Sequence, residues 1–301
     1  IYNHKALRKK LLSLGVNFLG NSDTEVFLNA IELWGLIDTL KLSAGMFAFA
    51  IYDKLNHQIF LVRDRVGEKP LYYGWQGKGQ SRVFLFGSEL NSMRSHPSWI
   101  GGVDLDAVAQ LLRYNYIPAP MTIHPGVKKL IPGSILKLEG DGNGNWHECK
   151  LEKWWSLQDL IDSNRNEKSK DSDEDAVLKL DALMKDVISE QLMADVPVGV
   201  FLSGGIDSSS VLAQMQSISS KPINSFTIGF DNVDFDESLT ARQIAKHIGS
   251  DHQEWIMSPN DAMEIINDLP LIYDEPFADA SQIPTILISR FAKKNVSVCL
   301  Q

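Results

Sequence analysis

The segment with the clearest chemical potential is residues 203–209, SGGIDSS, which combines two glycines, three hydroxyls and one carboxylate. Glycine lets the backbone come close to a ligand, because it has no Cβ atom to obstruct the approach. If a helix follows, free N–H groups at its start would face an anion, together with the hydroxyls of Ser203, Ser208 and Ser209. The carboxylate of Asp207 would repel a bare phosphate, and it makes sense if Mg²⁺ lies between them.

This loop differs from the common nucleotide P-loop, because it lacks the lysine of the GxxxxGK[ST] pattern that grips a γ-phosphate. We therefore interpret it as a cradle for pyrophosphate. The alternative is a tight turn between a strand and a helix, in which Asp207 serves only as an N-terminal cap.

The residues around the loop alternate between predicted strands and helices. Strands are expected at 197–202, 223–230, 252–257 and 296–300, and helices at 208–215 and 237–248, with two more helical segments before the last strand. A further helix is expected over 177–193, with apolar residues at 177, 180, 184, 187, 188 and 192. Strands separated by helices predict a doubly wound parallel sheet covered on both faces. In that class, ligands bind at the carboxyl ends of the strands, where this loop would lie.

The first half of the chain has a different pattern, in which short β-rich runs dominate. These runs are 46–53, 58–63, 82–87 and 133–138, and helical patterns flank them at about 23–34 and 105–114. The sequence GDGNGN at 140–145 lacks the second half of a GxGxxG motif and no helix follows it, so it predicts a hairpin turn. Together these signals indicate a layered β structure with hairpins.

A polar run separates the two halves. Residues 163–175 contain no apolar side chain, so they predict a solvated linker or a long exposed loop.

The overall composition excludes several classes of protein. Hydrophobic residues make up 44% and charged residues 22%, as in ordinary globular proteins. The net charge of −9 disfavours a nucleic-acid partner. Cys149 and Cys299 lie far apart and have no nearby cluster of metal-ligand spacing, so neither a disulfide framework nor a zinc site is expected. Without a bilayer-spanning apolar run or a signal peptide, the sequence predicts a soluble, cytoplasmic protein with no membrane partner.

The loop resembles the pyrophosphate loop of the ATP pyrophosphatases, and neighbouring segments narrow the resemblance. Residues 195–205 (DVPVGVFLSGG), 225–230 (SFTIGF) and 274–279 (DEPFAD) are similar to the synthetase domain of glutamine-hydrolysing asparagine synthetases. In the first half, 1–4 (IYNH), 22–25 (SDTE), 45–50 (GMFAFA) and 63–73 (RDRVGEKPLYY) are similar to the glutaminase domain of that family. The segments also occur in the family's order.

The resemblance implies both a fold and a domain plan. Residues 1–162 would form a class II glutamine amidotransferase-like domain, an α+β layered sandwich of the N-terminal nucleophile type. Residues 163–175 would be the linker. Residues 176–301 would form the α/β ATP pyrophosphatase domain, with its doubly wound parallel sheet.

The resemblance also implies a reaction, with ATP and Mg²⁺ as cofactors and glutamine and aspartate as substrates. A cysteine releases ammonia from glutamine, and the ammonia passes to a second site, where ATP has adenylated aspartate; the products are asparagine, AMP and pyrophosphate. The residues that would bind ATP and pyrophosphate are Phe201, Leu202, Ser203, Gly204, Gly205, Asp207, Ser208, Ser209 and Ile228, with Asp207 also holding Mg²⁺. Asp23 would bind the α-ammonium of glutamine, and Asp274 and Glu275 would lie near the acceptor or a metal. A homodimer is left open.

Several of these residues also have simpler interpretations. Ser22 to Glu25 can be a capping box that opens a helix, with or without a role for Asp23 in binding. Phe201 and Ile228 can be core residues of their strands. Asp274 and Glu275 precede a proline and a helix, so they can form a solvated cap. Residues 63–73 are expected to form a structural corner, in which arginine and aspartate side chains satisfy one another.

The sequence departs from the family pattern at both ends. Residue 1 is Ile, so the nucleophilic cysteine and its Asn-Gly-Glu segment are missing, and neither Cys149 nor Cys299 stands in the nucleophile's place. The chain also stops before the family's second ATP loop. We therefore expect a chain truncated at both ends and inactive by itself.

Other functions stay open. The segment DEPFADASQIP at 274–284 resembles a broader branch of the family whose acceptors include sugar or peptide carboxylates. A catalytically inactive, nucleotide-binding regulatory homologue is a further alternative. A tRNA-modifying ATP pyrophosphatase is opposed by the negative charge and by the glutaminase-like first half.

Overall fold

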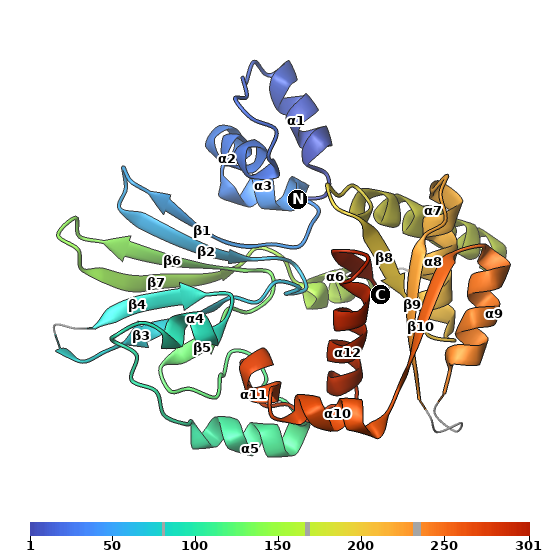
Figure 1. Ribbon diagram of the computed structural model, residues 1–301. Coiled ribbons are helices and arrows are strands. Elements are labelled where there is room, and N and C mark those ends of the chain that lie inside the picture. Colours follow the sequence, from blue (N-terminus) through green and yellow to red (C-terminus); the bar gives the residue numbers. More distant parts are fainter. Residues whose placement is uncertain (80–81, 166–168, 231–235) are drawn as a thin grey trace. The chain divides into compact units, whose positions relative to one another are not determined.

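The computed structural model describes residues 1–79, 82–165, 169–230 and 236–301. The chain divides into two compact units (Figure 1). The first comprises Ile1–Lys168 together with Tyr273–Ala278, and the second comprises Ser169–Ile272 together with Asp279–Gln301. The first unit therefore includes six residues from a much later part of the chain.

Two antiparallel sheets form the centre of the first unit. One has the order β1-β2-β6-β7 and the other the order β4-β3-β5. Their strands are β1 (Ala48–Asp53), β2 (Gln58–Arg63), β3 (Tyr72–Gln76), β4 (Val83–Gly87), β5 (Val127–Lys129), β6 (Ser134–Gly140) and β7 (Trp146–Lys153). Gly140 pairs with Trp146, so the predicted hairpin turn at 140–145 is confirmed.

Alternating side chains of the first sheet build two apolar layers. Leu61 and Leu136 pack with Tyr73 of β3, between the two sheets. Val62 and Ile135 lie in a cluster with residues of α2 (Asp23–Trp34) and α3 (Leu36–Leu42). This alternation is what a strand buried on both faces requires.

The remaining helices of this unit complete the layers. Residues of α4 (Leu90–Arg94) and α5 (Leu105–Tyr114) pack with Val127 of β5. The unit also contains α1 (His4–Ser13) and α6 (Leu157–Asn164). The arrangement in Figure 1, with helices α2 and α3 against one sheet and a second sheet behind it, confirms the predicted α+β layered sandwich.

Three strands of this unit were not predicted. β7 carries the sequence WHECKLEK and exposes most of its side chains, so it lacks the apolar alternation that marks a half-buried strand. β3 begins inside the segment expected to be a corner, and β5 has only three residues. Sheet pairing, rather than local apolar pattern, determines these strands.

The corner itself is held by hydrogen bonds to the backbone. The buried carboxylate of Asp64 accepts hydrogen bonds from the backbone N–H groups of Phe47, Gly67, Glu68 and Lys69. The guanidinium groups of Arg63 and Arg65 donate to backbone carbonyls. Residues 63–73 therefore form the predicted structural corner. The expected pairing of arginine with aspartate is wrong, because both the arginine and the aspartate side chains bond to the backbone instead.

The second unit contains a parallel sheet of order β10-β9-β8-β11. The strands are β8 (Val198–Phe201), β9 (Asn224–Phe230), β10 (Asp251–Met257) and β11 (Val298–Leu300). The first strand, β8, is central; the next two extend to one side, and β11 lies on the other. This reversal is the topological switch point of a doubly wound sheet, so the predicted class is confirmed.

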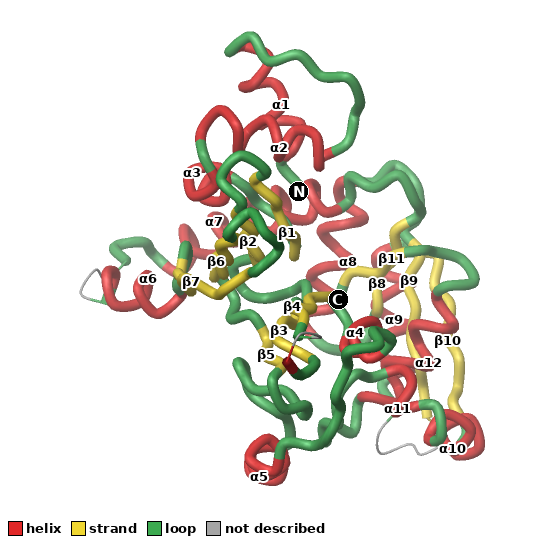
Figure 2. The backbone as a smooth tube through the Cα atoms, turned by 90° about the vertical axis from the view of Figure 1, so that its left-hand side faces the viewer, coloured by secondary structure: helices red, strands yellow, loops and turns green. Residues whose placement is uncertain are grey.

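Helices cover both faces of this sheet. Residues of α7 (Asp173–Gln191), α8 (Ile206–Ile218) and α9 (Ser238–Ile248) pack on one face, and α12 (Gln282–Ala292) packs on the other. Figure 2 shows the strands side by side, with helices on either side of them. Two shorter helices, α10 (Pro259–Ile266) and α11 (Leu269–Ile272), precede α12.

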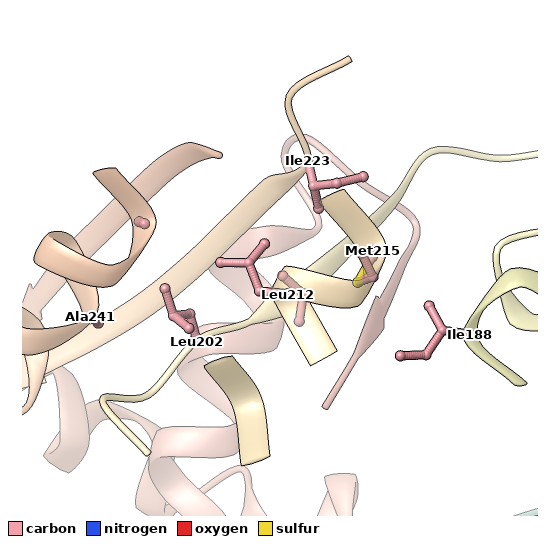
Figure 3. Close-up of a cluster of buried hydrophobic side chains, with 8 residues drawn as sticks. Ile188, Leu202, Leu212, Met215, Ile223 and Ala241 are labelled. Carbon is pink, nitrogen blue, oxygen red and sulfur yellow. The ribbon is translucent and has the colours of Figure 1, made fainter. Parts of the chain in front are cut away.

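The core beneath α8 is shown in Figure 3, where Leu212 and Met215 of α8 lie near Leu202 and Ile223. Only part of the predicted stripe on α7 joins this core. Ile188 is buried, whereas the side chains of Val177 and Leu180 are 65% and 57% exposed. The helix is confirmed, but most of its apolar stripe is not covered within the second unit.

Helices extend into both ends of the run expected to be a linker. α6 continues to Asn164, and α7 begins at Asp173. Ser172 accepts a hydrogen bond from the backbone N–H of Asp175, and three acidic residues occupy the first turn of α7. Polar residues of these types stabilise a helix start, so a stretch without apolar residues can still begin a helix. Residues 166–168 lie outside the described part of the chain.

Candidate functional site: a nucleotide cavity and an acid-bearing cavity

A cavity of about 760 Å³ lies at the carboxyl ends of β8 and β9 in the second unit. Its lining comes from both strand ends, from the loop that starts α8, from α12 and from the residue after β11; it comprises Phe201, Leu202, Ser203, Ser208, Thr227, Ile228, Phe230, Glu237, Ala280, Ser281, Pro284, Thr285, Ile288 and Gln301. A doubly wound sheet is expected to bind its ligand at this place. The volume is in the range of small-molecule and cofactor sites.

The apolar wall of the cavity is formed by the ends of the two strands. Phe201 and Ile228 both line it and are both partly buried against the core beneath α12. Thr227 donates its hydroxyl proton to the carbonyl of Leu202, which ties the strand ends together. Leu202 is only 2% exposed, so its side chain serves mainly the core. The site and core interpretations of these residues are therefore compatible.

The polar wall is the glycine–serine loop. The hydroxyl oxygens of Ser203 and Ser208 lie 2.9 Å apart. The backbone N–H of Ser203 donates to Ser208 Oγ over 3.1 Å, and that of Gly205 donates to Ser203 Oγ over 3.2 Å. Ser209 Oγ instead donates to the Gly205 carbonyl over 2.6 Å, inside the first turn of α8. The loop thus brings amide and hydroxyl donors together at the N-terminus of α8.

The cap interpretation of Asp207 is wrong. α8 starts at Ile206, two residues earlier than predicted, and its N-cap is Gly205, without a side-chain cap. Asp207 therefore lies within the first helical turn, and its side chain is exposed. An acidic residue in a first turn still favours the helix.

Position 204 requires glycine because a larger side chain would have too little room, and not because the backbone has an unusual angle. A Cβ atom at this position would lie 3.0 Å from both Cβ and Cγ2 of Thr240, on α9. At Gly205, the nearest atom to a Cβ would be Ser203 Oγ, at 3.2 Å. The loop is therefore packed tightly against α9 at its first glycine only.

A second cavity, of about 380 Å³, lies in the first unit and contains Asp23. Its walls come from α2, from the segment around β1, and from Lys69 and Ser88. The Asp23 carboxylate lines this cavity, and a carboxylate so placed has the chemistry expected for recognising the α-ammonium of an amino acid.

The capping box expected at Ser22 to Glu25 is only half formed. Ser22 accepts a hydrogen bond from the Glu25 backbone, as an N-cap does. The Glu25 carboxylate, however, accepts from the backbone of Leu19 and Gly20. Asp23 takes no part in the cap, and it lines the cavity.

Asp274 and Glu275 are bonded within the first unit, and neither is among the residues that line the nucleotide cavity. The Asp274 carboxylate accepts from the backbone N–H groups of Leu90 and Asn91, at the start of α4. Glu275 pairs with Lys129 over 2.6 Å and accepts from the Ile123 backbone over 2.6 Å. Asp274 is thus a cap, but for a distant helix, and the Glu275 side chain is only 10% exposed, not solvated. Both carboxylates are thus bonded to groups of the first unit.

The cysteines do not line the Asp23 cavity. Cys149 is exposed on β7, and burial raises the pKa of Cys299 to about 11. The sequence did not predict a cluster of metal-ligating residues around Cys149. The pairing of β6 with β7 nevertheless brings ligand atoms of Glu139, His147 and Cys149 within 4.8 Å of one another. Lys137 already pairs with Glu139 over 2.7 Å. The sequence signal for this cluster was weak because Glu139 comes from the neighbouring strand.

Sequence reasoning also missed part of the nucleotide cavity. Glu237, Thr227 and the wall formed by Ala280, Ser281 and Thr285 were not predicted to line it. Glu237 lies beyond the carboxyl end of β9, so the rule of strand ends could have found it, whereas Thr227 lies in the middle of that strand. The wall near α12 depends on packing across the sheet.

The comparisons with known proteins agree with this two-part architecture. Residues 1–155 match the family described as glutamine amidotransferase domain, and residues 179–301 match asparagine synthase. These two domains, in this order, define a synthetase joined to a glutamine amidotransferase domain. The chain belongs to the glutamine-hydrolysing asparagine synthetase family.

Two relatives illustrate the similarity. The chain is 33% identical over 305 residues to asparagine synthetase [glutamine-hydrolyzing] 1 of Bacillus subtilis, covering 100% of this chain and 44% of the relative. It is also 33% identical over 303 residues to a putative asparagine synthetase [glutamine-hydrolyzing] 2 of Methanocaldococcus jannaschii, covering 100% of this chain and 55% of the relative. The chain thus spans about half the length of these relatives. Among the described helices, none has the length and apolar character needed to cross a membrane.

Proposed function

We propose that the chain forms part of an ATP-dependent, glutamine-hydrolysing amide synthetase that converts aspartate to asparagine. The observation that carries the proposal is the cavity at the ends of β8 and β9, with the glycine–serine loop at the start of α8. The family membership and the printed names of the relatives support the choice of glutamine and aspartate. A homodimer, which the family also suggests, would be tested by sedimentation velocity.

In this proposal the loop binds the pyrophosphate part of ATP. The hydroxyls of Ser203 and Ser208, two residues that line the cavity, and the backbone N–H groups of the loop would donate to phosphate oxygens. Phe201 and Ile228 supply an apolar slot for adenine. Fixed donors at the leaving pyrophosphate stabilise the charge that develops when the bond between the α and β phosphates breaks.

The residues present fit a magnesium ion. Mg²⁺ keeps several waters and takes one or two carboxylates together with phosphate oxygens. Asp207 offers an exposed carboxylate in the first turn of α8, one residue before Ser208, although it is not among the residues that line the cavity. When bound, Mg²⁺ would neutralise phosphate charge, and Asp207 would hold it next to the loop.

The first unit would bind glutamine in the Asp23 cavity. The Asp23 carboxylate would accept the α-ammonium of the substrate. The carboxylates of Asp274 and Glu275 are bonded within the first unit, and neither residue lines the nucleotide cavity. The choice of aspartate as acceptor therefore rests on the relatives.

The test is calorimetric binding of ATP to the full chain in the presence of Mg²⁺. Asp207→Asn should weaken binding by at least about tenfold, because the carboxylate next to the phosphates acts through the cation. Asp195→Asn, at an exposed position before β8, is the matched control and should bind like the wild type. Equal affinities for all three proteins would contradict the metal-bridging role of Asp207.

A further inference from the structure

A carboxylate of this chain accepts a hydrogen bond from one of the backbone amides of the glycine–serine loop. Glu237 Oε2 accepts a hydrogen bond from the backbone N–H of Gly204, with an N···O distance of 3.3 Å. Glu237 immediately precedes α9 and stands at the N-cap position, yet its side chain makes no cap for that helix. It reaches across to the loop instead, and its presence in the lining places it inside the nucleotide cavity.

The neighbouring amides of the loop have partners of a different kind. Those of Ser203 and Gly205 donate to the hydroxyls of Ser208 and Ser203. A hydroxyl can rotate to donate to an incoming phosphate, so these two contacts are easily exchanged. The contact at Gly204 is with an anion, which has the same acceptor chemistry as a phosphate oxygen. One N–H group cannot make a full hydrogen bond to both.

The charges in the cavity sharpen this competition. Glu237 is the sole charged residue in the described lining, which contains no lysine or arginine. Asp236, next to Glu237 in the sequence, accepts from the backbone and hydroxyl of Ser238. A metal-free polyphosphate would therefore meet the negative charge of Glu237.

We propose that Glu237 determines specificity for metal-complexed phosphate. In the absence of ligand its carboxylate accepts the hydrogen bond of the Gly204 amide. When phosphate binds together with a divalent cation, the phosphate replaces the carboxylate at this amide. Without a cation, the phosphate has to displace Glu237 against mutual repulsion. With Mg²⁺ present, the cation offsets that repulsion and the amide becomes available. This inference rests on the proposed function of the loop and adds a role for a residue outside it.

The experiment is calorimetric titration of the full chain with inorganic pyrophosphate, once with EDTA and once with excess Mg²⁺. Glu237→Gln removes the charge but keeps an oxygen acceptor, whereas Glu237→Ala removes both. Both variants should bind metal-free pyrophosphate at least about tenfold more tightly than the wild type, because a close like charge is gone. Their affinity for the magnesium complex should stay within about threefold of the wild type, since the cation already compensates the charge.

The matched control is Glu264→Gln, an exposed residue of α10 that makes the same change in net charge away from this cavity. It should show the wild-type ratio of the two affinities. A wild-type ratio in Glu237→Gln would overturn the inference, and a large loss of magnesium-pyrophosphate binding would make Glu237 a metal ligand instead. If the wild type binds pyrophosphate in neither condition, the proposed function of the loop fails as well, so the two failures can be told apart.

Discussion

The ammonium of Lys129 lies 2.6 Å from the carboxylate of Glu275, and their side chains are only 17% and 10% exposed. Each group has a further partner: Lys129 donates to the Ile117 carbonyl, and Glu275 accepts from the Ile123 backbone. The pair joins β5 to the late segment Tyr273–Ala278 within the first unit. It is therefore a largely buried ion pair, supported by further hydrogen bonds, between distant parts of the chain.

Removing one partner of this pair should be costly. Lys129→Met leaves the largely buried Glu275 carboxylate without its cation; breaking a fully buried pair costs about 3–5 kcal/mol, so this partly exposed pair should cost about 2–3 kcal/mol. The free energy of unfolding, measured by urea denaturation of the full chain, should fall by that amount. The control is Lys150→Met, which breaks an ion pair with Glu152 whose side chains are 65% and 41% exposed. Exposed pairs contribute less than about 1 kcal/mol, so equal losses in both variants would contradict a role for burial.

The two glycines of the loop should respond differently to alanine. At Gly204 the new Cβ would press against Thr240, and overpacking of this kind costs about 1–3 kcal/mol. At Gly205 the backbone has φ of −77° and the nearest atom is the end of a flexible side chain. Gly204→Ala should therefore lower thermal stability and weaken ATP binding, whereas Gly205→Ala should change stability little. The reverse order would mean that the packing against α9 does not restrict the loop.

His252 should make stability depend on pH. Burial lowers the pKa of His252, its Nδ1 is 2.9 Å from Ser225 Oγ, and its buried Nε2 has no hydrogen-bond partner. An unfolded histidine titrates near pH 6.5, approximately the reference value. As the pH falls through that value, the unfolded chain takes up a proton before the folded chain does, so this contribution to stability is present at higher pH and is lost toward lower pH.

The measurement is the urea unfolding free energy at several pH values between neutral and mildly acidic. His252→Gln should flatten the decline that the wild type shows, whatever its effect on stability at neutral pH. His147→Gln, at an exposed position on β7, should leave the decline unchanged. An unchanged slope in His252→Gln would show that another group is responsible.

Trypsin should cut first between α6 and α7. Arg165 and Lys170 are exposed and lie between Asn164, where α6 ends, and Asp173, where α7 begins. Lys168, also expected as a site, lies outside the described residues. Lys221 is equally exposed, but its carbonyl accepts from Gln216 and Ser219, so its backbone is held in place. Mass spectrometry of the earliest fragments would check the order, and a first cut after Lys221 would contradict it.

The sequence predicted those elements whose pattern is local. β2 and the helices α2 and α5 have the predicted limits, because their apolar residues repeat with the period of the element. β7 was missed, since an exposed edge strand has no apolar alternation. On α7 the pattern gave the helix but not its burial, which depends on what packs against it.

The same distinction applies to the site. The position of the loop follows from the strand before it and the helix after it, so sequence could place it. The contact between Glu237 and Gly204 and the bonds of Asp274 and Glu275 join residues that are far apart in the chain. Long-range contacts of this kind leave no local pattern to read.

The return of Tyr273–Ala278 to the first unit has a consequence for modularity. A single recombination event near residue 168 would not separate two self-sufficient modules, since the leading piece would lack the segment that caps α4 and pairs with Lys129. Each unit is therefore built from two separate stretches of the chain. Replacing either half with that of a relative would therefore succeed only if Lys129 and Glu275 were inherited together.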